Sequence, residues 1–241
     1  MSALLELAEV SKRFAGLLAV DSVSFVVPRG SIVGLIGPNG AGKTTIFNLI
    51  AGVFRPDRGR ILFDGREIGG LKPHVLCRAG VARTFQIARP FGALSTLENT
   101  MVGAFRAGAD TQAAEKRARA VLERLGLAEK AHAPAHGLTL PERRRLEVAR
   151  ALATEPKLLL LDEAMAGLRP IEVDAMVGTL AELVRESGLT ILLTEHVMRA
   201  VMSLSHHIVV VHHGQKIAEG TPEHVAADAR VIECYFGRSA H

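Results

Sequence analysis

The sequence predicts an α/β fold in which helices cover a parallel β-sheet. The second half of the chain alternates between apolar runs and helical patterns over 171–186 and 197–204, as a sheet of this kind requires. The apolar runs are continuous, without a polar residue at every second position, which is typical of strands buried on both faces. The predicted strands are 31–36, 158–161, 189–193 and 208–211.

The N-terminal region has a different pattern. Short strands are predicted at 4–10, 21–27 and 59–63, and the turn sequences Pro28-Arg29-Gly30 and Pro56-Asp57-Arg58-Gly59 lie between or beside them. We therefore expect an antiparallel β subdomain on one flank of the parallel sheet.

The middle of the chain, 88–153, is predicted to be a helical insertion. It lacks strand patterns and is rich in Ala, Arg, Glu and Leu. Ser95-Thr96-Leu97-Glu98 and Thr139-Leu140-Pro141-Glu142 both match the capping box that begins many helices. We expect one domain with two lobes, which are a catalytic lobe and a helical subdomain. Their bounds are 1–87 with 154–241 for the first and 88–153 for the second, within a single domain 1–241.

Composition excludes several classes of protein. A chain of 241 residues with 48% hydrophobic residues can bury a large core, so it is not disordered. The net charge of +4 suits anionic ligands or lipids, and its spread along the chain does not indicate nucleic acid. Cys77 and Cys234 lie far apart without metal-ligand spacing, so neither a disulfide framework nor a zinc site is expected. No signal peptide and no apolar run of ~20 residues is present, so we expect a cytoplasmic protein.

A phosphate-binding loop is the strongest motif in the chain. The segment Gly37-Pro38-Asn39-Gly40-Ala41-Gly42-Lys43-Thr44 matches G-x-x-x-x-G-K-[ST] and lies between the strand 31–36 and a helical run that starts at Thr45. Its glycines let backbone N–H groups point at phosphate oxygens, and the helix adds the positive end of its dipole. Lys43 is expected to reach the β and γ phosphates and Thr44 to bind Mg²⁺, with Thr45 also beside the nucleotide.

Two carboxylates end the predicted strand 158–161. Asp162 is expected to serve Mg²⁺, usually through water. Glu163 is placed to polarise the water that attacks the γ-phosphate, a general-base role worth about 10²–10⁴ in rate. The alternative is that the two residues are only a cap or surface charges. The phosphate loop favours the catalytic interpretation.

Kinases, GTPases and recombination-type motors also have such a loop, so further motifs must decide the family. Three occur in one order: Gln86 in Arg83-Thr84-Phe85-Gln86, the segment 138–150, and Thr194-Glu195-His196. In these motifs and this order, over nearly its whole length, the chain resembles the ATPases of ABC transporters. The resemblance implies a P-loop NTPase (RecA-like) core sheet with an antiparallel β subdomain and an inserted helical subdomain. It also implies ATP hydrolysis, with ATP and Mg²⁺ bound.

The resemblance implies further site residues. Phe14 would stack on adenine, Gln86 would contact Mg²⁺ or the attacking water and sense the permease, and His196 would contact the γ-phosphate. The competing interpretations are that Phe14 belongs to the core and that His196 merely ends a strand. Other histidines, such as His206, are expected to face solvent and not to bind metal.

The signature segment of the family, Leu-Ser-Gly-Gly-Gln, is altered here. It appears as Leu138-Thr139-Leu140-Pro141-Glu142, and in the family it closes over the ATP held by the other subunit. Thr139 can still offer a hydroxyl, whereas Pro141 removes one N–H donor and Glu142 could cap Thr139 instead. A hydrogen bond to a charged group is worth about 1.5–3 kcal/mol, so we expect one of two sites to be slowed without being abolished.

Within the family, the chain is most similar to ATPase subunits of importers for branched-chain amino acids and related amides or urea. The stretches that carry this similarity are 14–20, 83–97, 166–170 and 231–237. It implies a peripheral position on the inner face of the cell membrane, with integral membrane permease subunits, a second ATPase subunit of the same or a different kind, and indirectly an extracytoplasmic solute-binding protein. Nucleic acid is not an expected partner.

Three alternatives stay open. The first is a lipopolysaccharide-export-type ATPase, because the segment 142–150 resembles that subfamily as well. A non-transport ABC protein acting on ribosomes or DNA would usually carry two ATPase units or a long coiled-coil insertion. A subunit that binds ATP while its partner does most of the hydrolysis would suit the altered signature segment.

Overall fold

The continuous apolar runs form the central strands of one sheet. The computed structural model describes residues 2–84, 90–106 and 110–236, and within them this sheet has six strands in the order β10-β9-β3-β8-β7-β6. The four predicted strands are all present, and each pairs in parallel with at least one of the others. They are β3 (Ile32–Ile36), β7 (Leu158–Asp162), β8 (Thr190–Thr194) and β9 (His207–His212). Every residue of β3, β7 and β8 is buried, so the prediction of a covered parallel sheet is confirmed.

The sheet has two edge strands that the sequence did not predict. Strand β6 (Val81–Arg83) is parallel to β7 and has only three residues, too few for a periodic pattern. Strand β10 (Gln215–Gly220) is antiparallel to β9 and mostly polar. Short or polar strands at a sheet edge form by hydrogen-bonding to the neighbouring strand, so they need no apolar run that a sequence pattern could reveal.

The predicted antiparallel subdomain is also present. In the described residues its strand order is β2-β1-β4-β5, with all pairs antiparallel. The strands are β1 (Ala3–Phe14), β2 (Leu17–Pro28), β4 (Arg58–Phe63) and β5 (Arg66–Glu67). Strands β1 and β2 are longer than expected because they continue as a hairpin to a turn at Ala15 and Gly16. That turn brings Phe14 toward the phosphate loop, as the site below shows.

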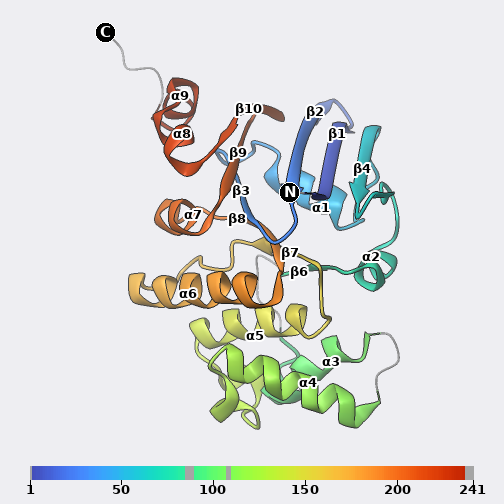
Figure 1. Ribbon diagram of the computed structural model, residues 1–241, viewed down its shortest axis with the longest axis vertical. Helices are drawn as coiled ribbons and strands as arrows, with labels where there is room; N and C mark the ends of the chain where they lie inside the picture. The colour runs from blue at the N-terminus through green and yellow to red at the C-terminus, as the bar shows by residue number, and fades with distance from the viewer. Residues whose placement is uncertain (1, 85–89, 107–109, 237–241) are drawn as a thin grey trace.

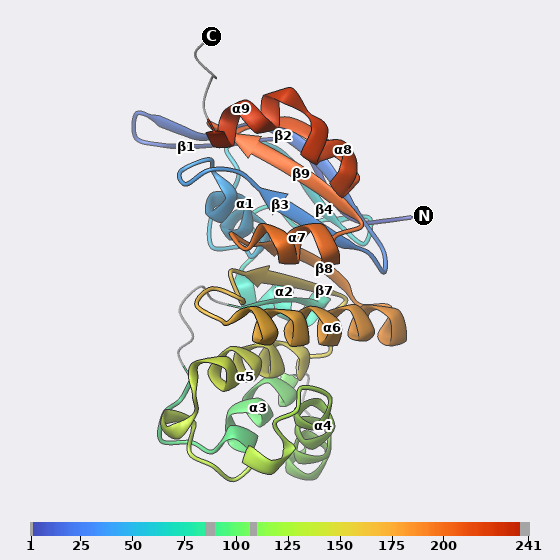
Figure 2. The ribbon, with the colours of Figure 1, turned by 90° about the vertical axis from the view of Figure 1, so that its left-hand side faces the viewer.

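Helices pack on the parallel sheet from two sides. Helix α1 (Lys43–Ile50) shares an apolar core with both sheets, so it lies between them. Helices α6 (Pro170–Ser187) and α7 (Met198–Leu204) belong to a second core on the other side, and Figure 2 shows them facing the viewer in front of the strands. The remaining helices of this part are α2 (Pro73–Ala79), α8 (Pro222–Ala227) and α9 (Ala229–Phe236).

The middle of the chain is helical and lies at one end of the long axis in Figure 1. Its elements are α3 (Thr96–Ala104), α4 (Thr111–Arg124), α5 (Leu140–Leu152) and the short 3₁₀ helices η2 (Ala128–Lys130) and η3 (Ala135–Gly137). Both predicted capping boxes form, since the backbone N–H of Ser95 donates to Glu98 at 2.7 Å and that of Thr139 donates to Glu142 at 2.8 Å. We propose that 88–153 is the helical subdomain and that 1–87 and 154–241 make the catalytic lobe.

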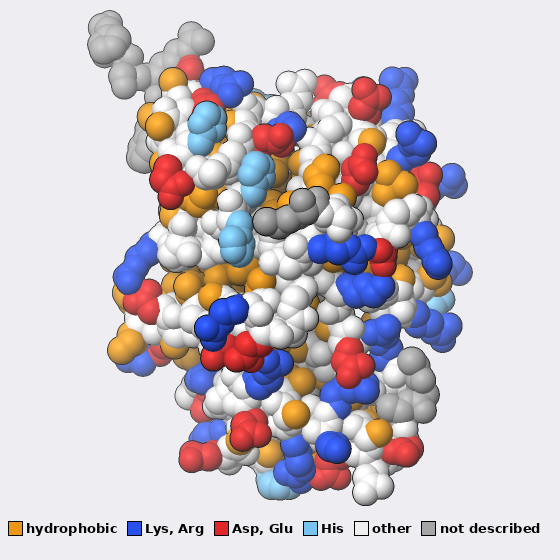
Figure 3. Space-filling model, in the orientation of Figure 1, with side chains coloured by type: hydrophobic (Ala, Val, Ile, Leu, Met, Phe, Trp, Pro, Cys, Tyr) orange, Lys and Arg blue, Asp and Glu red, His pale blue; other side chains and the backbone are white. Residues whose placement is uncertain are grey.

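The surface carries charges of both signs. On the face shown in Figure 3, Lys and Arg side chains are most frequent along the side of β4 and α2, with some Asp and Glu side chains among them. Among the described residues, no helix combines the length and the apolar character needed to cross a membrane.

Candidate nucleotide-binding site

The phosphate loop joins β3 to α1, and close packing explains two of its glycines. A Cβ on Gly37 would lie 2.0 Å from the carbonyl oxygen of Val211, and one on Gly42 would lie 2.6 Å from that of Ala19. Gly42 is also the residue before α1, with a φ of 105° that side chains rarely allow. The chain therefore wraps tightly around the start of α1, where the helix N-terminus exposes free N–H groups.

Lys43 holds the loop closed. Its side chain is buried, and Nζ donates to the carbonyl oxygens of Gly37 at 2.6 Å and Pro38 at 2.9 Å. Burial lowers the pKa of the Lys43 ammonium, while the nearby carboxylates of Glu163 and Asp162 act in the opposite direction. A buried ammonium surrounded by carbonyl groups is a donor that phosphate oxygens can engage.

A pocket of about 480 Å³ lies over the loop and collects most of the predicted site. Phe14 reaches it from the tip of the β1–β2 hairpin, partly exposed and packed edge-on against Phe54 with ring centroids 5.0 Å apart. Glu163 and His196 reach it from the ends of β7 and β8. The other predicted residues that line it are Asn39, Gly40, Ala41, Gly42, Lys43, Thr44 and Thr45. Thr139 is not among the lining residues, and Gln86 lies outside the described residues.

Asp162 is buried and held by two neighbouring strands. Its Oδ1 accepts from the hydroxyl of Thr194 at 2.8 Å, and its Oδ2 accepts from the guanidinium of Arg83 at 2.8 Å. Arg83 also donates to Asn48 on α1. The sequence motifs contained Arg83 and Thr194 without assigning them a role, because their contacts depend on strand pairing β6–β7 and β7–β8.

The oxygen atoms of Thr44 and Asp162 at this edge of the sheet are suitable ligands for Mg²⁺. Thr44 lines the pocket, and the Asp162 carboxylate is near enough to influence the Lys43 ammonium. Hydroxyl and carboxylate oxygens suit Mg²⁺, which in nucleotide sites takes one or two protein ligands beside phosphates and water. In the described part of the chain, no group of three or more His, Cys, Asp or Glu side chains could hold a metal ion.

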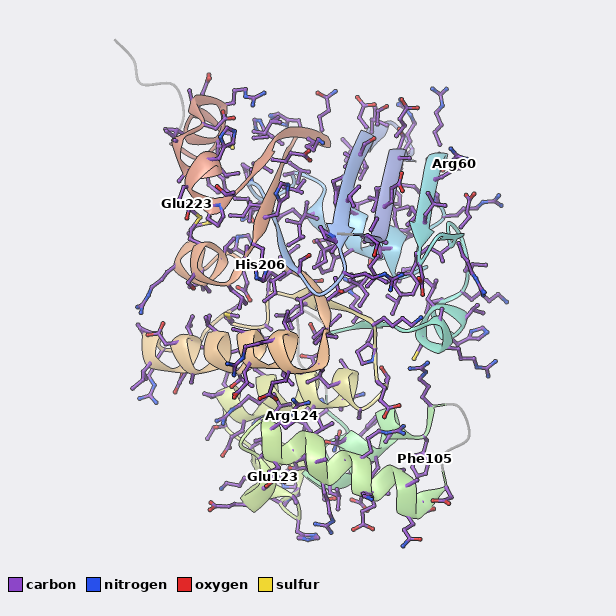
Figure 4. The ribbon with its side chains drawn as sticks, viewed as in Figure 1. Arg60, Phe105, Glu123, Arg124, His206 and Glu223 are labelled. Atoms are coloured by element: carbon purple, nitrogen blue, oxygen red, sulfur yellow. The ribbon has the colours of Figure 1, made fainter. Side chains whose placement is uncertain are left out.

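Glu163 and His196 form a hydrogen-bonded pair at the pocket. His196 Nε2 lies 2.9 Å from Glu163 Oε1, and the backbone N–H of Glu163 donates to Thr194 at 2.9 Å. Glu163 has a φ of 48°, a left-handed conformation that is uncommon for residues other than glycine. A carboxylate aimed at a phosphate site and oriented by an imidazole can act as a general base toward water. His206, by contrast, lies between α7 and β9, where its Nδ1 accepts the N–H of Ile32 (Figure 4).

Thr139 stands at the N-terminus of α5, where Glu142 is its partner. Glu142 Oε2 accepts from the Thr139 N–H at 2.8 Å and from the Thr139 hydroxyl at 2.9 Å. These bonds lower the pKa of Glu142, which favours the carboxylate. The hydroxyl that the resemblance assigns to the nucleotide of another subunit is thus engaged within its own chain.

The fold and the pocket define a P-loop nucleoside triphosphatase. A family model described as ABC transporter matches residues 20–166, and one described as branched-chain amino acid ATP-binding cassette transporter matches 215–241. The chain therefore belongs to the ABC transporter ATP-binding family, which confirms the resemblance drawn from its motifs.

Individual relatives align with this chain over almost its full length. The high-affinity branched-chain amino acid transport ATP-binding protein BraF of Pseudomonas aeruginosa is 41% identical, with 98% of each chain covered. The lipopolysaccharide export system ATP-binding protein LptB of Escherichia coli is 38% identical over 95% of each chain. A crystal structure of the ADP conformation of an ATP-binding cassette from an ABC transporter superposes with a TM-score of 0.90 at 31% identity, covering 99% of this chain and 100% of that one.

Proposed function

We propose that this chain binds and hydrolyses ATP to power the import of branched-chain amino acids or related small polar solutes. The observation that carries the proposal is the pocket itself, where the phosphate loop, Glu163 and His196 meet. The solute class is supported by the relative BraF and by the family model over 215–241. The similarity to LptB keeps lipopolysaccharide export as the second candidate, but that C-terminal match favours the importer.

Each site residue has a defined part in this function. Phe14 stacks on adenine, the loop amides and Lys43 hold the phosphates, and Thr44 and Asp162 would hold Mg²⁺, which neutralises phosphate charge. Glu163 accepts the proton of the attacking water, and His196 keeps its carboxylate in place and contacts the γ-phosphate. Gln86, by the family resemblance, contacts Mg²⁺ or the water.

We further propose that the site is completed by a second ATPase subunit, either a copy of this chain or a different one. Thr139 belongs to the helical part of the chain and does not line the pocket, so it can act only on a nucleotide held elsewhere. Closure of two subunits on ATP, each contributing a phosphate loop to one site and a signature segment to the other, would drive the transporter, and hydrolysis would reset it.

An apolar groove supports docking to permease subunits at the inner face of the membrane. It has a volume of about 350 Å³ between the catalytic lobe and the helical subdomain. Val53, Val102 and the half-buried Cys77 line it, and the exposed Phe105 lies nearby at the end of α3 (Figure 4). Exposed apolar side chains around a groove are typical of an interaction site. The permease would in turn receive solute from an extracytoplasmic binding protein.

Two measurements test this function. Uptake of labelled leucine is measured in cells lacking the chain and complemented with the parent or with Lys43→Ala, and only the parent should restore it. Normal leucine uptake without the chain, with defective lipopolysaccharide export, would favour the second candidate. Docking is tested by maleimide labelling of Cys77 in a Cys234→Ala variant, since the sequence has two cysteines. The permease should protect Cys77, and equal labelling with and without it would refute the groove.

A further inference from the structure

Three consecutive residues at the end of β8 each contact the last residue of β7 or the residues just after it. Thr194 binds Asp162 through its hydroxyl at 2.8 Å, and His196 binds Glu163 at 2.9 Å. Between them, Oε1 of Glu195 accepts the backbone N–H of Met165 at 2.7 Å. The first and last of these residues belong to the nucleotide site, whereas Glu195 has no part in the function described above.

Glu195 is buried far more deeply than a glutamate after a strand usually is. Only 3% of it is exposed. Its second oxygen, Oε2, is buried without a hydrogen-bond partner among the described residues. A carboxylate in such a place is costly, so burial raises the pKa of Glu195 and the neighbouring Glu163 adds to the rise, while the N–H groups of Met165 and His196 oppose it. The environment therefore favours the neutral acid, which a glutamine can replace.

The contact from Glu195 lies where the backbone needs support. Glu163 has a left-handed φ of 48°, and such a conformation persists only when its surroundings hold it. On one side the Glu163 N–H is held by Thr194 at 2.9 Å. On the other side the Glu163 carbonyl accepts only from Ala166 within the same turn, at 3.3 Å, and the bond that ties this turn to the end of β8 is the one from the Met165 N–H to Glu195. The backbone that carries the Glu163 carboxylate is thus hydrogen-bonded to the end of β8 both at Glu163 and two residues later.

We propose that Glu195 is a positioning residue for ATP hydrolysis, which fixes the backbone after Glu163 by accepting the Met165 N–H and so keeps the Glu163 carboxylate aimed at the attacking water. This inference rests on the proposed function, because it presupposes that Glu163 is the general base. Glu195 itself reaches neither nucleotide nor water. Its loss should therefore lower kcat and leave ATP binding unchanged.

The test compares Glu195→Gln with Glu195→Met in the full chain. Glutamine keeps an acceptor for Met165 in a neutral side chain, whereas methionine keeps the length and removes the acceptor. We expect kcat within about twofold of the parent for Glu195→Gln and about 10–100-fold lower for Glu195→Met, since small misplacements of a catalytic group have effects of that size. The dissociation constant for ATP should stay within about twofold in both. Amide hydrogen exchange at Met165 should accelerate in Glu195→Met only.

A matched control is Thr190→Val at the other end of β8. The hydroxyl of the buried Thr190 accepts the backbone N–H of Gly30 at 2.9 Å, so this variant also loses one such bond, but far from the pocket. It should lower the melting temperature and leave kcat unchanged. The proposal is overturned if Glu195→Met keeps the parental kcat, if its ATP affinity falls with kcat, or if Met165 exchange does not change. A parent that binds ATP without hydrolysing it would instead contradict the proposed function, and the exchange measurement would still judge the role of Glu195.

Discussion

Removing the carboxylate that caps α5 should strengthen ATP-dependent pairing of this chain with itself. Glu142 Oε2 takes both the N–H and the hydroxyl of Thr139, and Pro141 lacks an N–H to offer a phosphate. Pro141→Gly with Glu142→Gln restores one N–H donor and removes one negative charge in each signature segment. A hydrogen bond to a charged group is worth about 1.5–3 kcal/mol, or about 3–6 kcal/mol over two sites. At 1.4 kcal/mol per factor of ten, dimerisation should tighten about 10²–10⁴-fold.

The assay is light scattering over a range of protein concentrations with ATP and Mg²⁺, in chains that also carry Glu163→Gln so that ATP persists. Glu98→Gln is the matched control, because Glu98 caps Ser95 at the start of α3 in the same way, with 2.7 Å to the Ser95 N–H. Glu142→Gln and Glu98→Gln should each weaken a helix cap by about 1 kcal/mol, and melting curves will measure this loss of stability. The reasoning is refuted if the double variant dimerises no better than its parent, or if Glu98→Gln has an equal effect.

Three further predictions concern single groups. Lys43→Ala should weaken ATP binding about 10–100-fold, the worth of one charged hydrogen bond, in a calorimetric titration; unchanged affinity would contradict the role of Lys43. Gly37→Ala should abolish ATP binding because its Cβ would lie 2.0 Å from Val211, whereas Gly16→Ala, with no atom within 4 Å, should bind normally. Arg230 lowers the pKa of Asp228 from 3.8 to about 2, so the support that Asp228 gives to α9 is complete above pH 3.8 and is lost as the pH falls toward 2; amide exchange in α9 should accelerate over that range, and constant protection would disprove it.

The parts of the fold that the sequence predicted are those with a strong local pattern. β3, β7, β8 and β9 consist mainly of apolar residues, with polar residues only at the strand ends, and the two capping boxes have fixed spacing. The short helices α2, α8 and α9 were not predicted, because helices of six to eight residues have little stability of their own. Helices α1 and α7 are equally short, but each follows a predicted strand, and this context made them predictable. Strand β6 was missed because pairing with β7, not composition, makes it a strand.

The site shows the same division between local and non-local information. The phosphate loop is contiguous, so its residues were named from the motif alone. That Asp162 binds Arg83 and Thr194 follows only from the strand order β8-β7-β6. The burial of Glu195 was also beyond the sequence, because a charged residue at a strand end is ordinarily exposed.

The most direct test of the account is ATP turnover by the parent chain and by Glu163→Gln, with ATP affinity measured on both. Glu163 lines the pocket, and Glu163→Gln keeps the size of the side chain, so the variant should still bind ATP. A general base contributes about 10²–10⁴ in rate, and turnover should fall by at least about 100-fold. Equal turnover in the two proteins would contradict the assignment of Glu163 and with it the proposed mechanism of hydrolysis.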